Sequence, residues 1–361
     1  MTADQAGGEP AAEVAPATSP VVVTMGEPAG IGGEIVLKSW LRRREGLPPF
    51  VVIDDADRLA TLAASLKLDV PIVRYERLET RQPGGSLPED ALPVLHCPLA
   101  RPAVPGRPDA ANAPAVVHAI ERAVQLVMTG AAAALVTAPV HKKVLYDGGF
   151  RFPGHTEFLA ALAGEGIRPV MMLAGEVLRV VPVTIHVSLR RAIESLRTED
   201  IVEAASITGA ALRHDFGIAF PRLAVAGLNP HAGEDGAMGR EELDIIAPAL
   251  QVLRERGIAA FGPVPPDTLF TAGARQGYDA AICMYHDQAL IPLKALDFDG
   301  GVNVTLGLPF ARTSPDHGTA LDLAGTGRAS ENSMMAALRM AASIAARRAA
   351  APVPKPAEDA S

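Results

Sequence analysis

The sequence predicts an α/β protein built on a mostly parallel sheet, and three observations lead to this fold class. Apolar runs of strand length alternate along the chain with stretches of helical periodicity, which is typical of βαβ units. Hydrophobic residues make up 48% of the chain but aromatic residues only 4%, so the core has to be built from Ala, Val, Leu and Ile. A length of 361 residues also exceeds the comfortable size of one core, which favours two lobes.

Five short apolar runs are predicted to be buried strands, because each ends in a polar or glycine-rich loop. They cover residues 21–26, 132–140, 178–187, 222–230 and 279–287. Six stretches with helical spacing of apolar residues lie between or after them: 33–44, 111–129, 157–163, 198–214, 241–256 and 332–348. This alternation indicates parallel strands joined by helical crossovers.

Polar residues lie at or just beyond the ends of the predicted strands. They are Glu27, His141, His186, His231 and His286. Ligands of open α/β sheets bind beyond the carboxyl ends of the strands, so the pattern predicts one shared site.

Three of these histidines are candidate metal ligands. His186 ends VVPVTIH, His231 lies in GLNPHAGEDG and His286 lies in MYHDQ. Three neutral imidazoles with one open position make a catalytic metal site. The spacing is long and matches no local ligand motif, so a hydrogen-bonded loop histidine is the alternative reading of each.

The run 284–323 is the segment richest in chemistry, and we expect it to be a loop system between strands. It carries His286, Lys294, Asn303, Arg312 and His317 among glycines and prolines. Together these side chains could bind a metal, an anion and a nucleotide side by side. The alternative for Lys294 and Arg312 is a solvated surface charge, or a lysine stem packed on apolar surface.

Two further motifs have a structural and a functional interpretation. In FPGHTEFLA, Thr156 could be the N-cap of a helix, and with His155 it could bind an anion or a hydroxyl. The loop GEPAGIGGEI is rich in glycine but matches neither GxGxxG nor a Walker A pattern. A tight strand-to-helix turn is therefore the favoured role for this loop.

Composition narrows the class of partner. The net charge of -8 and the pI near 5.6 argue against nucleic acid or an anionic membrane. No segment is long and apolar enough to span a bilayer, and the N-terminus lacks the pattern of a signal peptide.

Cys97 and Cys283 are too few for a disulfide framework, which suits a reducing, cytoplasmic compartment. Residues 1–19 and 349–361 are predicted to be a disordered leader and tail.

Six motifs occur in the order found in one enzyme family. They are GEPAGIGGEI, TAPVHKK, FPGHTEFLA, GLNPHAGEDGAMGREE, YHDQALIPLK and NVTLGLPFARTSPDHGTALDLAGTGRASENSM. With them the chain resembles the 4-hydroxythreonine-4-phosphate dehydrogenases of pyridoxal phosphate biosynthesis. The resemblance implies the two-domain fold of isocitrate and isopropylmalate dehydrogenases, not a Rossmann fold. It also implies a homodimer with each active site at the subunit interface.

The resemblance assigns roles to matching positions. His186, His231 and His286 match a divalent-metal site for Zn, Mg or Co, with one ligand contributed across the dimer. The matching substrate-binding positions are His155, Thr156, Lys294, Asn303 and Arg312. Lys294 is also a candidate catalytic base. Gly318, Thr319 and Ala320 match the loop that lines the adenosine of NAD or NADP. The implied lobes are residues 20–135 with 295–348 on the nucleotide side, and 136–294 with the metal site and the dimer interface.

The implied reaction oxidises 4-phosphooxy-L-threonine at C3, after which the β-keto acid loses CO2 to give 3-amino-2-oxopropyl phosphate. Dehydrogenases of D-threonate or D-erythronate 4-phosphate, or of a cyclic dihydrodiol, share the motifs and remain alternatives. A phosphate acyltransferase and a non-catalytic sensor are further alternatives. Gly33, His141 and Ala289 depart from the commonest family pattern, and the last two leave the substrate open.

Overall fold

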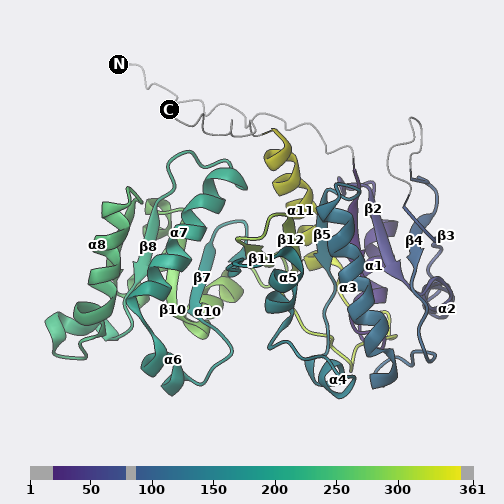
Figure 1. The fold of residues 1–361 in the computed structure, drawn as a ribbon, viewed down its shortest axis with the longest axis horizontal. Coiled ribbons are helices and arrows are strands. Elements are labelled where there is room, and N and C mark those ends of the chain that lie inside the picture. The colour runs from purple at the N-terminus through teal and green to yellow at the C-terminus, as the bar shows by residue number, and fades with distance from the viewer. Residues whose placement is uncertain (1–18, 79–86, 351–361) are drawn as a thin grey trace.

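The computed structural model describes residues 19–78 and 87–350, which form one twelve-stranded sheet with helices on both faces (Figure 1). The strand order is β3-β4-β2-β1-β5-β12-β11-β6-β7-β10-β8-β9. The predicted leader and tail fall outside the described residues except for Ser19 and the last two residues of helix α11.

The sheet has two halves that meet at two central strands. The first half contains β1 (Val21–Thr24), β2 (Phe50–Asp54), β3 (Ile72–Tyr75), β4 (Leu92–His96), β5 (Ala134–Thr137) and β12 (Ala311–Pro315). The second half contains β7 (Arg179–Thr184), β8 (Leu223–Ala226), β9 (Ala260–Val264) and β10 (Ala280–Tyr285). Strands β11 (Val302–Leu306) and β6 (Val170–Ala174) lie between them. All five predicted strands are present, as β1, β5, β7, β8 and β10.

Helices cover both faces of this sheet. Their bounds are α1 (Gly32–Leu41), α2 (Ala56–Ser65), α3 (Ala113–Met128), α4 (Lys142–Asp147), α5 (His155–Ala163), α6 (Leu189–Ser195), α7 (Thr198–His214), α8 (Ala247–Glu255), α9 (Pro266–Leu269), α10 (His286–Leu296) and α11 (Asn332–Ala350). The six predicted helices appear as α1, α3, α5, α7, α8 and α11, with a π-helical turn before α8. Within the described residues, no helix combines the length and the apolarity needed to cross a bilayer.

The expectation that the run 284–323 is a loop system is wrong for most of its length. Lys294 lies in helix α10, Asn303 in β11 and Arg312 in β12. The physical reason is an alternation of apolar and polar residues, which gives a strand one apolar face and one polar face. Within the run, only residues 297–301, 307–310 and 316–323 lie outside helices and strands.

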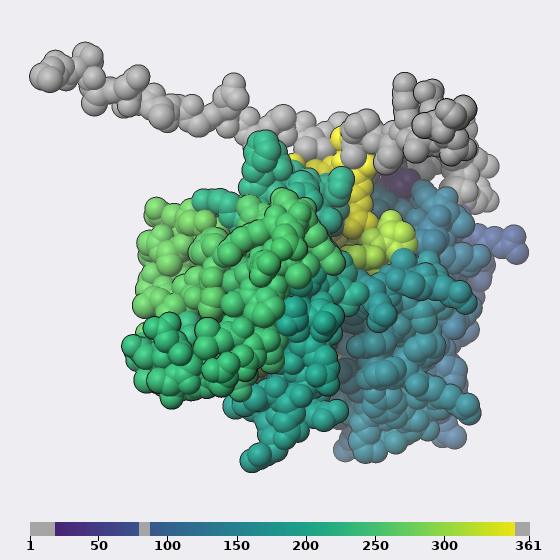
Figure 2. Space-filling model, turned by 60° about the vertical axis from the view of Figure 1, so that its left-hand side comes forward, coloured from purple at the N-terminus to yellow at the C-terminus, as the bar shows by residue number. Residues whose placement is uncertain are grey.

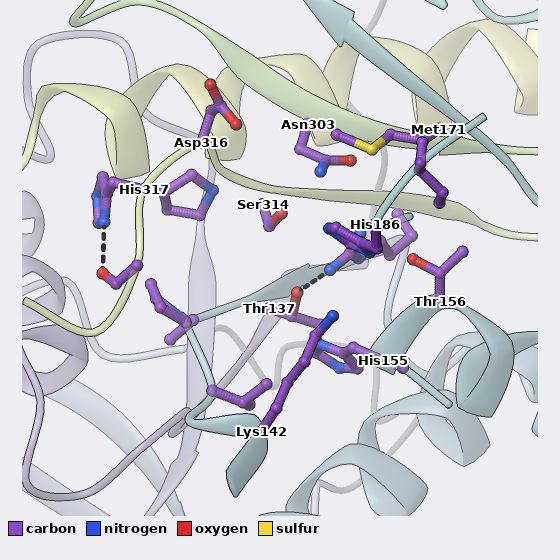
Figure 3. Close-up of a pocket in the computed structure, with 18 of the residues that line it drawn as sticks. Thr137, Lys142, His155, Thr156, Met171, His186, Asn303, Ser314, Asp316 and His317 are labelled. Atoms are coloured by element: carbon purple, nitrogen blue, oxygen red, sulfur yellow. Dashed lines mark hydrogen bonds between the residues drawn. The ribbon is translucent and has the colours of Figure 1, made fainter. Parts of the chain in front are cut away.

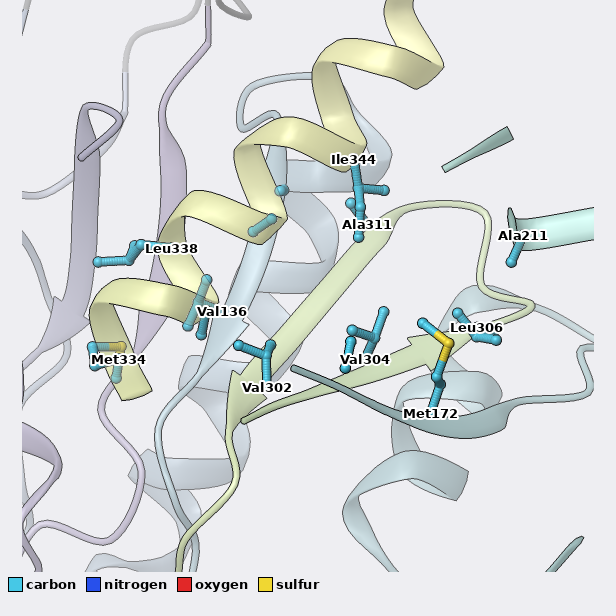
Figure 4. Packing of buried hydrophobic residues seen from close by; sticks show 14 of the residues in the cluster. Val136, Met172, Ala211, Val302, Val304, Leu306, Ala311, Met334, Leu338 and Ile344 are labelled. Atoms are coloured by element: carbon cyan, nitrogen blue, oxygen red, sulfur yellow. The ribbon is translucent and has the colours of Figure 1, made fainter. Parts of the chain in front are cut away.

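The alternation directs apolar side chains of the central strands into the core. Val302, Val304 and Leu306 of β11 and Ala311 of β12 belong to a buried cluster with Leu338 of α11 (Figure 4). Helices α1, α2, α7 and α8 supply other members of this cluster. On the opposite face the core is divided, with one cluster under α3 and α5 and another under α9 and α10. The central strands separate these two clusters on that face.

The strands of the two halves run in opposite directions. β5 pairs with β12 in parallel, but the pairings β12–β11, β11–β6 and β6–β7 are all antiparallel. Because of these three reversals, β7, β8 and β10 run in the opposite direction to β1 and β5. Strand order and direction both differ from the all-parallel 3-2-1-4-5-6 sheet of a Rossmann fold. The predicted α/β class with a mostly parallel sheet is confirmed.

Candidate active site

A pocket of about 350 Å³ lies on the polar face of the central strands (Figure 3). Its floor carries Arg312 and Ser314 of β12, Asn303 of β11 and Met171 of β6. The segment after β5 and the start of α5 form one wall, and α10 with the end of β7 forms the other. The pocket therefore spans the central strands on one face of the sheet. It is bordered by loops that follow strands of both halves.

Arg312 is a buried cation without a carboxylate partner among the described residues. Its guanidinium donates to the hydroxyl of Thr305 at 2.8 Å and to that of Thr137 at 2.5 Å. Its Nε is buried and has no hydrogen-bond partner, and burial lowers the pKa of Arg312 to about 10. A buried charge of this kind is costly unless it is paired. The site is therefore prepared for an anion.

His155 and Thr156 stand at the start of α5, but the prediction of a threonine cap is wrong. The helix begins at His155, its N-cap is Gly154, and no side chain caps it. Gly154 leaves both side chains free to line the pocket. The Nε2 atom of His155 is buried without a partner. Burial, then the charges of Arg312 and Lys142, hold its pKa well below the ordinary value, so the imidazole is neutral at physiological pH.

Lys294 and Asp316 form an ion pair inside the pocket. The Nζ atom of Lys294 lies 3.1 Å from a carboxylate oxygen of Asp316 and also donates to its backbone carbonyl at 3.3 Å. Burial raises the pKa of the Asp316 carboxyl, although Lys294 opposes that shift. Lys294 is thus held by a partner that can itself accept a proton.

Two of the three predicted metal ligands come together in the chain. The rings of His186 and His286 lie 5.9 Å apart between centroids, and both line the pocket. His231 is exposed and lies outside it. Within the described residues, no group of three or more His, Cys, Asp or Glu side chains is arranged to hold a metal.

The backbone is strained at both His186 and His231. Their φ angles are 48° and 52°, in the left-handed region that a residue with a Cβ adopts only at a cost. The loop of His231 is held by the buried carboxylate of Glu242, which accepts from the backbone of Leu228 and Asn229 at 2.7 Å each. Such strain persists only where the surroundings enforce it, and two of the candidate ligands carry it.

The predicted nucleotide loop rests on the glycine-rich turn after β1. Ile31 donates to the carbonyl of Thr319 at 3.1 Å. The buried carboxylate of Glu34 accepts from Ala329 at 3.0 Å and from Gly327 at 3.3 Å. The motif GEPAGIGGEI therefore forms a tight turn, as expected, and Glu34 in it supports the other loop.

Of the predicted substrate and metal residues, all but His231 line the pocket. Of the predicted nucleotide residues, Gly318 lines it, and Thr319 and Ala320 follow in the same loop. Two other polar residues that follow strands do not line it. Glu27 is buried and accepts from Ala29, and His141 accepts weakly from Val144 at 3.4 Å. Glu27 and His231 follow β1 and β8, which lie one strand farther from the central strands than β5 and β10, whose ends reach the pocket.

Five polar lining residues were missed by sequence reasoning: Thr137, Lys142, Glu157, Ser314 and Asp316. Three of them had a usable signal. Thr137 ends β5, while Ser314 shares a face with Arg312 at a spacing of two. Lys142 immediately follows His141, which the sequence pattern did select. Nothing local in the sequence marks Asp316 as the partner of Lys294.

The geometry defines an α/β protein with a pocket between two halves of one sheet, which holds a buried arginine beside a pair of histidines. The family described as "Pyridoxal phosphate biosynthetic protein PdxA" matches residues 47–341, and the chain belongs to this family. This confirms the resemblance drawn from the motifs.

Named relatives extend this assignment. The "4-hydroxythreonine-4-phosphate dehydrogenase" of Caulobacter vibrioides is 54% identical over 335 residues, which cover 91% of this chain and 98% of the relative. A crystal structure of the enzyme of that name from Klebsiella pneumoniae has a TM-score of 0.81 at 40% identity, covering 91% and 100% of the two chains. A "Terephthalate 1,2-cis-dihydrodioldehydrogenase" from Burkholderia xenovorans has a TM-score of 0.60 at 27% identity, covering 90% and 98%.

Proposed function

We propose that this protein is a metal-dependent dehydrogenase that oxidises 4-phosphooxy-L-threonine at C3 with NAD or NADP, in the biosynthesis of pyridoxal phosphate. The immediate product is 2-amino-3-oxo-4-phosphooxybutanoate. This β-keto acid loses CO2 to give 3-amino-2-oxopropyl phosphate, because the ketone accepts the electrons of the broken C–C bond. Relatives named for this activity at up to 54% identity support the assignment.

One observation of the structure carries the proposal: a buried arginine, for which the described residues supply no carboxylate partner, lies in a pocket of about 350 Å³. Arg312 suits a phosphate or carboxylate, because a guanidinium binds either group through two parallel hydrogen bonds. The protein as a whole is acidic, so a local cation has to provide this attraction. His155, Thr156 and Asn303 add uncharged hydrogen-bonding groups around it.

Oxidation of a secondary alcohol releases a hydride and a proton. Lys294 is our candidate for the base that takes the proton. A bound nicotinamide would accept the hydride. Lys294 would pass a proton to the Asp316 carboxylate and, as the neutral amine, take the proton of the hydroxyl. The partly desolvated carboxyl of Asp316 can accept the proton from Lys294, because burial raises its pKa. An ion-paired lysine is less suited to neutralising the phosphate, so we assign that task to Arg312.

The pair of histidines fits a divalent metal in part. His186 and His286 would hold the ion together with His231 of a second copy of the chain, since His231 lies outside the pocket of its own chain. Bound there, a divalent metal supplies Lewis-acid stabilisation of the alkoxide that develops as hydride leaves. Neutral imidazole ligands leave the charge of the ion undiminished.

A homodimer is part of the proposal, and exposed apolar residues near the histidines support it. Val187 and Leu189 follow His186, while Met238 and Leu243 follow His231, and each is between 44% and 57% exposed. Large exposed apolar side chains that gather around a site indicate an interface. Figure 2 shows the half that contains them, coloured green, beside the first half in blue.

The dinucleotide is assigned to the loop after β12. Gly318 is exposed, and a Cβ at this position would meet no neighbouring atom, so the backbone is open to a ligand. Ala320 has a φ of 40°, which costs energy and agrees with a functional constraint on the loop. Gly318, Thr319 and Ala320 are the residues we propose beside the adenosine.

The lobes and the compartment remain predictions. We propose residues 20–135 with 295–348 as one lobe and 136–294 as the other, with α5 packed on α3 across that division. Cys97 and Cys283 are both buried free thiols, which agrees with the proposed cytoplasmic location.

The test is the reduction of NAD and of NADP by purified protein supplied with a divalent metal. We expect 4-phosphooxy-L-threonine to be oxidised far more efficiently than D-threonate or D-erythronate 4-phosphate. Turnover of the sugar acids alone would keep the site chemistry and replace the substrate. Turnover of only a cyclic dihydrodiol would contradict the role given to Arg312, because that substrate need not carry a phosphate.

A further inference from the structure

We infer that Lys142 is a substrate-binding residue that, with Arg312 and His155, forms the subsite for the phosphate group. This assignment deepens the proposed function and rests on it for the identity of the substrate. Lys142 opens helix α4, directly after the segment 137–140 that forms one wall of the pocket.

The side chain of Lys142 is directed into the pocket. It is one of the lining residues, and Figure 3 shows it reaching from α4 toward Thr137 and His155. Thr137 is also the residue whose hydroxyl holds Arg312, at 2.5 Å. Thr137, Lys142 and Arg312 therefore line one part of the same pocket.

His155 lines the same pocket as Lys142 and Arg312. After burial, the charges of Arg312 and Lys142 contribute to the lowered pKa of His155. The buried Nε2 of His155, which has no partner, thus lies within reach of two positive charges. A group that contacts all three would have to be negatively charged.

The charge of Lys142 is not neutralised by the described part of the chain. The other lysine of the pocket, Lys294, pairs with Asp316 at 3.1 Å. The adjacent Lys143 pairs with Asp147 at 2.7 Å. Among residues 19–78 and 87–350 no carboxylate lies within 4.0 Å of Lys142. A dianionic phosphate needs more than one cation, and Arg312 alone supplies a single charge.

Lys143 offers a matched control, since it follows Lys142 in the same helix, is 76% exposed and does not line the pocket. The experiment measures the binding of inorganic phosphate to the full-length protein by titration calorimetry, without nucleotide or alcohol substrate. The proteins compared are the wild type and the variants Lys142→Gln, Lys142→Arg and Lys143→Gln. The KM and kcat for 4-phosphooxy-L-threonine are then measured for each.

We expect Lys142→Gln to weaken phosphate binding by about 10- to 100-fold, the range for one lost hydrogen bond between charged groups. KM should rise by a similar factor with little change in kcat, because no bond of the phosphate group is made or broken in the oxidation at C3. Lys142→Arg should restore most of the affinity, and Lys143→Gln should bind as the wild type does. Unchanged melting temperatures would show that the fold is intact.

Equal phosphate affinity of Lys142→Gln and the wild type would overturn the inference. An equal loss of phosphate affinity in Lys143→Gln would also overturn it, because it would indicate a general effect of positive charge. Absence of phosphate binding by the wild type would do the same. If only the proposed function is wrong, phosphate binding would still depend on Lys142, but the wild type would not oxidise 4-phosphooxy-L-threonine.

Discussion

Replacing Arg312 by methionine should abolish substrate binding without destabilising the ligand-free protein. The guanidinium is 4% exposed, and burial lowers its pKa to about 10. At about 1.4 kcal/mol per pKa unit, keeping it charged in the folded state costs roughly 3 kcal/mol. The hydrogen bonds to Thr305 and Thr137 offset roughly 2 kcal/mol of that cost. Methionine removes both contributions and fills similar space.

The net change in the free energy of unfolding is therefore between zero and about 1 kcal/mol in favour of the variant. For 361 residues at about 2.1 cal/mol/K each, the unfolding entropy is roughly 0.76 kcal/mol/K. One kcal/mol then corresponds to a rise of about 1.3 °C in Tm. The assay is thermal unfolding without metal or anion, followed by the same measurement with inorganic phosphate.

Phosphate separates the two proteins more clearly. At 100 times its Kd, a ligand stabilises the folded state by about 2.7 kcal/mol, which would raise the Tm of the wild type by roughly 3.5 °C and leave Arg312→Met unchanged. The control is Arg222→Met, since Arg222 pairs with Asp279 on the surface, where it is 48% exposed. A fall of more than about 4 °C for ligand-free Arg312→Met would refute the reasoning, because it would mean that the folded chain compensates the charge.

Three further predictions concern a metal ligand, an ion pair and a buried histidine. His231→Ala should lose both bound metal and turnover while remaining a folded dimer; normal activity with undiminished metal content would exclude the three-histidine site. Arg348→Met should cost roughly 3 kcal/mol in urea unfolding, because it leaves the Asp215 carboxylate, 4% exposed, without its bidentate partner; a loss below about 1 kcal/mol would contradict this. His155 has a lowered pKa in the folded state, so the unfolded chain binds its proton first as the pH falls below 6.5. The unfolding free energy should then fall by up to roughly 1.4 kcal/mol per pH unit, and His155→Gln should show a shallower slope; identical slopes would rule out this origin.

The sequence determined the elements that carry strong patterns. Strands such as β1 and β10 were predictable because they are continuous apolar runs, and α7 and α11 because their apolar residues repeat with helical spacing. The edge strand β3 was missed because it is short and only partly buried. The strands β11 and β12 were interpreted as loops because Asn303, Arg312 and nearby glycines hid their alternation.

The candidate residues were likewise chosen from residue type and motif order, which need no knowledge of contacts. His186 and His286 were recognised because each follows an apolar run, and their approach to 5.9 Å agrees with that choice. The motifs also fixed the family, because order and residue identity are properties of the chain itself.

Only the tertiary structure decided which of these residues meet. Asp316 joins Lys294 because α10 runs back along the sheet. Lys142 reaches the pocket of Arg312 because β5 and β12 are neighbours whose paired residues are 177 positions apart in the chain. Strand order decided that His231 lies outside the pocket, since β8 runs parallel to β10 but lies one strand farther from the central strands. Local sequence carries residue type and periodicity, but the pairing of distant strands follows from how the whole chain buries its apolar surface.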